Sequence, residues 1–198
     1  MSDHIILADE GEKDENPDRA MLDRMLKSRT VIASKGVDDK LARDVIAQLL
    51  MLEADDADKP ITVIINSPGG SADSGFAMLD AMRFVKPPVR TIVMGMCASA
   101  AVMIHLAAEK KNRFASPNAR FLLHQPSMRT MGQASDLEIV STEIDRIRER
   151  YNRIVAEECG KTLEEVNDGV QRDFWLNAEE AVEYGLIDRV VTSRNEIE

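Results

Sequence analysis

Short apolar runs rich in β-branched residues recur along the chain and predict strands. The run 61–65 (Ile-Thr-Val-Ile-Ile) is nearly continuous, which is typical of a strand buried on both faces of a parallel sheet. Similar runs predict strands at 30–33, 91–94, 120–124 and 187–191. The sequence therefore predicts a sheet of several short strands.

Helical patterns lie between these strands. Asp38 can cap a helix whose apolar positions recur at helical spacing, namely Leu41, Val45, Ile46, Leu49 and Leu52. Two more helices are predicted, one after residue 71 that reaches about residue 85 and one over 98–108. Because strands and helices alternate, right-handed crossovers and a mostly parallel sheet are expected, and the predicted fold class is α/β.

A long helix is predicted in the second half of the chain. Ser135 and Glu138 form a capping-box pattern that opens a helix over 135–158, about 36 Å long at the standard rise. Its apolar residues alternate at spacings of three and four: Leu137, Val140, Ile144, Ile147, Tyr151 and Ile154. Such a narrow seam suits pairing with another helix better than covering a sheet. We therefore expect this helix to project as an oligomerisation arm.

Capping patterns also mark the C-terminal part of the chain. Thr162-x-x-Glu165 and Asn177-x-x-Glu180 each predict the start of a helix, and Gly185 is expected to end the last one. No internal repeat or linker divides the chain, so one domain is expected.

The chain is acidic, and part of the excess lies in its first residues. Its 198 residues include 35 Asp and Glu against 25 Lys and Arg, which gives a formal net charge of −10. Residues 1–20 hold seven of these acids and predict a flexible arm in front of a single domain over 21–198. This charge disfavours nucleic-acid backbones and anionic membranes, so neither is an expected partner.

Cysteine use and hydropathy favour a cytoplasmic protein. The two cysteines, Cys97 and Cys159, offer neither a disulfide framework nor a metal quartet. No apolar run reaches the roughly 18 residues that a membrane span requires, and no signal-peptide pattern is present. His, Cys and Glu also lack the spacings of metal sites, so we expect no metal.

Few residues are candidates for chemistry. Of the three histidines, His4 lies in the acidic arm, and His105 lies in the predicted helix 98–108, where a packed side chain is the ordinary interpretation. His124 ends a predicted strand, which is where α/β proteins place their sites. A strand-end histidine on its own is still more often structural.

Ser99 and a pair of glycines follow two predicted strands. Ser99 lies among small residues and is either a helix cap or a nucleophile, with the N–H of Ala100 available to an oxyanion. Gly69 and Gly70 are either a tight turn or the source of a second such N–H. No Gly-Lys-Ser/Thr follows, which excludes a P-loop. Cys97 is a rival nucleophile, but filling a small packing slot is its simpler role.

Five ordered blocks of the chain closely resemble ClpP, the proteolytic subunit family of the Clp protease. They are 64–70 (Ile-Ile-Asn-Ser-Pro-Gly-Gly), 94–99 (Met-Gly-Met-Cys-Ala-Ser), 124–126 (His-Gln-Pro), 132–136 (Gly-Gln-Ala-Ser-Asp), and Arg172-Asp173 leading into 178–188. The resemblance covers about residues 22–192. It implies the single-domain ClpP/crotonase-like fold, with repeated β-α-β units, a mostly parallel sheet and a projecting handle over about 125–158.

The resemblance implies a serine endopeptidase of the Clp type. By position in the family's motifs, Ser99 is the nucleophile, His124 is the general base, and Asp173 is the acid that orients the base. The backbone N–H groups of Gly70 and Ala100 would form the oxyanion hole. No cofactor and no metal are implied for the cleavage itself.

The resemblance also implies an assembly. Family members stack two heptameric rings into a barrel with inward-facing active sites, and the helix 135–158 matches the handle between the rings. Unfolded polypeptides enter through narrow pores and are supplied by a separate Clp-family AAA+ unfoldase, which consumes the ATP. The expected partners are therefore further copies of the chain, the unfoldase and unfolded protein substrates.

Several positions depart from the family's usual pattern. Thr62 and Ile64 stand where relatives usually place tyrosines, in the pocket that receives an unfoldase loop, and the acidic arm replaces the usual N-terminal segment. Gln171 stands where an acid commonly pairs with the arginine across the ring interface. Ser127 and Met128 replace glycines beside the site. These departures concern unfoldase docking, ring contact and substrate pairing, not the triad.

Two other functions remain open at this point. A catalytically weak or structural ring subunit that acts with an active paralogue fits the altered docking and ring-contact residues. A crotonase-type acyl-CoA enzyme would share the fold and a two-amide oxyanion hole, but it would require glutamates near the hole. Activity that is insensitive to Ser99→Ala would favour the latter.

Overall fold

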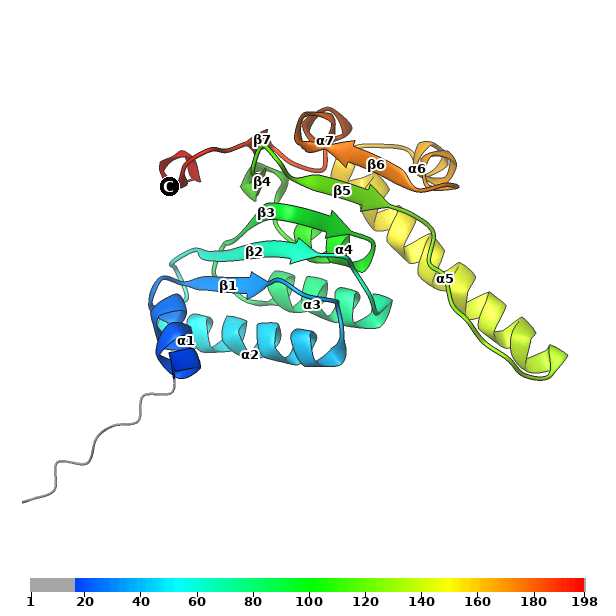
Figure 1. The fold of residues 1–198 in the computed structure, drawn as a ribbon, viewed down its shortest axis with the longest axis horizontal. Helices are drawn as coiled ribbons and strands as arrows, with labels where there is room; N and C mark the ends of the chain where they lie inside the picture. Colours follow the sequence, from blue (N-terminus) through cyan, green and yellow to red (C-terminus); the bar gives the residue numbers. More distant parts are fainter. Residues whose placement is uncertain (1–16, 198) are drawn as a thin grey trace, which may run out of the picture.

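A mostly parallel sheet organises the chain (Figure 1). The computed structural model describes residues 17–197, so the predicted arm residues 1–16, with His4, lie outside the described part. Within that part, seven strands form one sheet: β1 (Thr30–Ala33), β2 (Ile61–Ser67), β3 (Val89–Ala98), β4 (Arg113–Ala115), β5 (Arg120–Leu123), β6 (Phe174–Asn177) and β7 (Arg189–Val190). The main path is β1-β2-β3-β4-β7, all parallel, while β5 pairs parallel with β3 and β6 pairs antiparallel with β5. The predicted α/β class is confirmed.

Helices α2, α3 and α4 lie on one side of β1–β3, and α5 extends away from the domain (Figure 1). The helices are α1 (Pro17–Lys27), α2 (Asp39–Asp55), α3 (Ala72–Phe84), α4 (Ala100–Leu106), α5 (Ala134–Cys159), α6 (Leu163–Gly169) and α7 (Ala178–Tyr184), with short 3-10 helices η1 (Lys110–Asn112) and η2 (Arg194–Ile197). The projecting 26-residue α5 confirms the predicted long helix.

Three of the four predicted helix caps are formed. The Asp38 carboxylate accepts the N–H of Leu41 at 2.7 Å, and the boxes opened by Thr162 and Asn177 are complete. The box predicted at Ser135 is wrong. Because α5 begins one residue earlier, its N-cap is Gln133, whose side chain makes no capping bond.

Other differences concern edges and short elements. Residues 17–20, predicted as part of the arm, belong to α1. The prediction that β2 is buried on both faces is wrong for one of them, because Thr62 and Ile64 are only half-buried. That face of the sheet is the one that α2, α3 and α4 leave uncovered (Figure 1). Strands β4 and β6 have only three and four residues and were not predicted.

Ion pairs around the buried Arg113 fix the C-terminal end of α5 to the domain. The fully buried guanidinium of Arg113 donates to the carbonyl of Ala108 at 2.7 Å and pairs with the carboxylate of Glu158, in the last turn of α5. Arg83 donates to the other oxygen of the same carboxylate at 2.6 Å. Both arginines also donate to the carbonyl of Leu106, the last residue of α4. The C-terminal half of α5 is thereby held against α4, while its N-terminal half projects.

Candidate active site

Three loops meet at the carboxyl edge of the sheet. Gly69-Gly70 follows β2, Ser99 follows β3 and His124 follows β5. Parallel strands end at the same edge, and the register pairs Ala98 with Leu122, so the ends of β3 and β5 are adjacent. Gly70, Ser99 and His124 line one cavity of about 440 Å³. The structure thus brings together the predicted nucleophile, base and oxyanion donors.

Ser99 has an unusual backbone. Its φ of 55° and ψ of −124° place a residue with a side chain in a region that costs about 1–3 kcal/mol. Its N–H donates to the carbonyl of Leu122 at 2.9 Å, and its own carbonyl accepts the N–H of Val102 at 2.9 Å. Although Ser99 is the N-cap residue of α4, its side chain makes no capping bond. This argues against the simple cap interpretation and leaves the hydroxyl to the cavity.

The glycine pair is packed against Ser99. Gly69 and Gly70 have φ values of 87° and 152°. Two backbone hydrogen bonds to Val37 hold the turn: the N–H of Val37 donates to the carbonyl of Gly69 at 2.9 Å, and the N–H of Ser71 donates to the carbonyl of Val37 at 2.8 Å. Within residues 17–197 the N–H groups of Gly70 and Ala100 donate to no other group, and both residues line the cavity. Two free amides beside a serine are what an oxyanion hole requires.

Replacing Gly69 with Ala is expected to lower kcat for peptide hydrolysis at least about 100-fold, which is the effect of losing one oxyanion donor. The new Cβ would lie 2.5 Å from the carbonyl of Ala98 and 2.6 Å from the Cβ of Ser99, so the turn and Ser99 must separate. The rate on a fluorogenic peptide measures this. Gly160→Ala is the matched control: its φ is also positive (66°), but no atom lies within 4 Å of the added Cβ. Equal loss in both variants would contradict the expectation.

Strand pairing brings Asp173 towards His124. Strands β5 and β6 are antiparallel, and their last pair is Leu123 with Phe174, so the next residues across the pair are His124 and Asp173. Opposed residues in such a pair have Cβ atoms about 5 Å apart. His124 is half-buried, whereas Asp173 is exposed and lies outside the cavity lining. Within the described single chain, Ser99, His124 and Asp173 share no hydrogen bond, and such bonds commonly tighten only with substrate.

Two rival candidates are structural. Burial raises the pKa of the Cys97 thiol far above its usual range, which keeps it protonated and unreactive. His105 is fully buried, and its Nε2 lies 3.2 Å from the carbonyl of Leu186. Burial, aided by the charge of Arg113, lowers the pKa of His105 to about 3, so the ring is neutral. The packing interpretations of both residues are confirmed.

The rest of the cavity wall is apolar and comes largely from residues that sequence reasoning did not assign to a site. They are Phe76 of α3, Met103 of α4, and Ile144, Ile147 and Tyr151 of α5. The helical spacing of the last three indicated a seam, but spacing alone cannot separate a seam that faces another helix from one that faces a cavity. Ser127 and Met128 also line the cavity.

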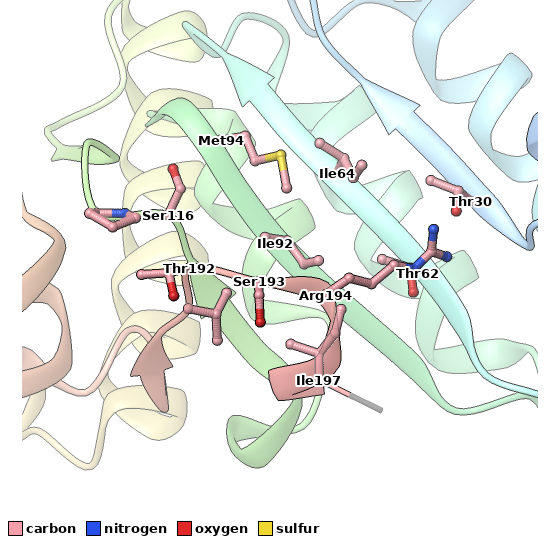
Figure 2. A pocket seen from close by; sticks show the side chains of 12 residues that line it. Thr30, Thr62, Ile64, Ile92, Met94, Ser116, Thr192, Ser193, Arg194 and Ile197 are labelled. Carbon is pink, nitrogen blue, oxygen red and sulfur yellow. The ribbon is translucent and has the colours of Figure 1, made fainter.

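A second cavity, of about 380 Å³, lies on the other face of the sheet (Figure 2). Thr62 and Ile64 of β2 line it together with Met94 of β3, and the C-terminal segment with Arg194 and Ile197 forms another part of its wall. It shares no lining residue with the cavity at Ser99. Thr62 and Ile64 therefore line a pocket that is separate from the cavity at Ser99.

Two negative findings hold for residues 17–197. His, Cys, Asp and Glu side chains nowhere gather in a group of three that could hold a metal ion. In the same part of the chain, each helix is too short or too polar to cross a membrane.

Comparison with known proteins gives a consistent family. The family model described as Clp protease matches residues 13–194. The ATP-dependent Clp protease proteolytic subunit 2 of Pseudomonas aeruginosa is 49% identical over 177 residues, covering 89% of this chain and 88% of that protein. Its counterpart in Treponema denticola is 43% identical over 182 residues, covering 92% and 91%. Among solved structures, a ClpP1 mutant from Listeria monocytogenes has a TM-score of 0.84 at 39% identity and covers 90% of this chain and 99% of its own.

Proposed function

The chain belongs to the Clp protease family, as a proteolytic subunit with serine endopeptidase activity, and we propose that Ser99, His124 and Asp173 are its catalytic triad. One observation carries the proposal. Ser99, in a strained backbone with its hydroxyl free of any capping bond, lines the same cavity as His124 and the unbonded amides of Gly70 and Ala100. This family match also removes the support for a crotonase-type acyl-CoA enzyme.

In the proposed reaction, the peptide bond is cleaved through an acyl-enzyme. His124 takes the proton of the Ser99 hydroxyl as the oxygen attacks the carbonyl carbon, and the Gly70 and Ala100 amides bind the resulting oxyanion. Collapse breaks the C–N bond, and His124 passes its proton to the leaving amine. Water then repeats the sequence, releasing the acid and restoring Ser99. Asp173 holds the imidazole in the tautomer that this requires.

We further propose that the substrate residue before the cleaved bond is apolar. The cavity beside Ser99 is walled by Phe76, Met103, Ile147 and Tyr151, and burying an apolar side chain there is favourable by about 25 cal/mol per Å². No cofactor and no metal take part in the proposed steps. Any ATP would be used by a partner.

Clp proteolytic subunits work as barrels with Clp ATPases, and we propose two stacked heptameric rings of this chain. The projecting half of α5 supports this, because it exposes Leu137 and Ile139, the latter with 63% of its surface accessible. Apolar residues on a projecting helix are suited to packing between rings. We also propose that the chain consists of an N-terminal arm followed by a single peptidase domain.

We propose that the second cavity, on the open face of the sheet, receives an apolar loop of an AAA+ unfoldase, which delivers unfolded polypeptides (Figure 2). Ile64, Ile92 and Met94 provide an apolar floor, and Ile197 closes one side. With Thr62 and Ile64 at the positions where relatives usually place tyrosines, contacts there rest on aliphatic side chains. Because two buried free thiols, Cys97 and Cys159, suit a reducing compartment, the proposed location is the cytoplasm.

The test of this function is hydrolysis by the purified chain. A short fluorogenic peptide with an apolar residue before the cleaved bond is expected to turn over without ATP and with a chelator present. Degradation of an unfolded protein is expected to require a Clp ATPase and ATP. Turnover that a chelator abolishes would contradict the proposal.

A ring subunit that needs an active paralogue is the second candidate. Gln171 favours it, because this exposed side chain lies 3.4 Å from Asp168 of its own chain and lacks the charge of the acid that commonly contacts the other ring. Peptide turnover that appears only after mixing with a second proteolytic subunit would select this candidate.

A further inference from the structure

Tyr151 of α5 reaches the backbone of the proposed nucleophile. Its side chain is buried, and its hydroxyl donates to the carbonyl oxygen of Ser99 at 3.4 Å. The same oxygen accepts the N–H of Val102 at 2.9 Å. Two donors from different helices therefore hold one carbonyl.

This carbonyl belongs to the peptide unit that carries the proposed oxyanion donor. The C=O of Ser99 and the N–H of Ala100 share one planar trans peptide, in which the two bonds point in opposite directions. A donor that fixes the direction of the C=O also fixes the direction of the N–H. It polarises the unit as well, which strengthens the N–H as a donor.

Contacts elsewhere on α5 hold the Tyr151 hydroxyl in place. Glu158, two turns further along the helix, is tied to the buried guanidinium of Arg113 and to Arg83. Burial also raises the pKa of Tyr151 well above its ordinary value, so the hydroxyl stays protonated and can donate at any working pH. Both features keep the contact with Ser99 in place.

Resting on the proposed function, we infer that Tyr151 is a positioning residue for the oxyanion hole. Its hydroxyl binds the C=O end of the peptide whose other end is the Ala100 N–H. The position of α5 therefore helps to set the direction of the Ala100 N–H. The effect belongs to the transition state, because the oxyanion forms only there. Substrate binding in the apolar part of the cavity depends on the ring of Tyr151 and not on its hydroxyl.

The experiment compares Tyr151→Phe with Tyr184→Phe. Both changes remove one buried phenolic hydroxyl, but that of Tyr184 bonds to no group within the described residues. Rates are expressed per Ser99 that reacts with a fluorophosphonate, so an inactive fraction does not count. The readouts are kcat, KM and the affinity for a peptide boronate, whose tetrahedral adduct places an oxygen in the oxyanion hole.

For Tyr151→Phe, kcat is expected to fall about 5- to 10-fold at unchanged KM, as for loss of one hydrogen bond that matters in the transition state. Boronate affinity is expected to fall by the same factor, and Tyr184→Phe is expected to match the wild type. Three results would overturn the inference: wild-type kcat in Tyr151→Phe, a loss expressed as higher KM, or equal losses in both variants. If the wild type neither reacts with the probe nor turns over peptide, the proposed function fails, and the inference falls with it.

Discussion

Replacing Ser99 with Ala is expected to lower kcat for peptide hydrolysis by about four to six orders of magnitude, because the variant lacks the hydroxyl that is proposed to form the acyl-enzyme. The rival thiol of Cys97 is buried and protonated. Initial rates on a fluorogenic peptide measure the loss. Since the Ser99 hydroxyl makes no capping bond, gel filtration and the thermal unfolding midpoint should match the wild type. A rate within tenfold of wild type would mean that Ser99 is not the nucleophile.

The second large effect is expected at Asp173. Asp173→Asn should lower kcat by about 10⁴-fold, because an amide can donate to the imidazole of His124 and so stabilise the wrong tautomer. The β5–β6 register places Asp173 opposite His124, because these residues follow the pair of Leu123 and Phe174. The measurement is again kcat on the fluorogenic peptide.

Asp168→Asn provides the matched control for this change. Asp168 is also exposed, lies five residues earlier at the end of α6, and its carboxylate accepts a hydrogen bond from the side chain of Gln171 at 3.4 Å. Its variant is expected to keep the wild-type rate. If Asp173→Asn also keeps that rate, a different acid must orient His124.

Local chemistry explains why much of the fold could be predicted from the sequence. The strand at Thr30–Ala33 has the bounds of the predicted run, and Asp38, Thr162 and Asn177 form their caps, since both signals depend only on neighbouring residues. The cap predicted at Ser135 is wrong, because the N-cap lies two residues earlier, at Gln133, and Ser135 is already inside the helix.

The site itself could not be assembled from local patterns. The pairing of β5 with β6 joins segments about fifty residues apart, and neither β6 nor its antiparallel direction follows from the periodicity of four residues. The assignment of Asp173 therefore rests on the resemblance to the family's motif, and the β5–β6 register adds a physical reason for its place opposite His124. The positive φ of Ser99 and the contact of Tyr151 with its carbonyl are likewise products of tertiary packing.

The two proposed roles, catalysis and docking of an unfoldase, belong to two separate cavities. One lies at the carboxyl edge of the sheet with Ser99, and the other lies against the open face with Ile64 and Met94. Both are bounded by β2 or β3 or by the loops that follow these strands. A partner bound at the second cavity would therefore contact β2 and β3, the strands that lead to Gly70 and Ser99.

The most direct test of the central claim, that Ser99 is an activated nucleophile, is the intact mass of the protein after reaction with a fluorophosphonate probe. Wild type and Ser99→Ala are compared, with Ser127→Ala as a control for a second serine that lines the same cavity. If Ser99 is the activated nucleophile, a single adduct is expected in wild type and in Ser127→Ala, and none in Ser99→Ala. An adduct that persists in Ser99→Ala, or its absence from the wild type, would contradict it.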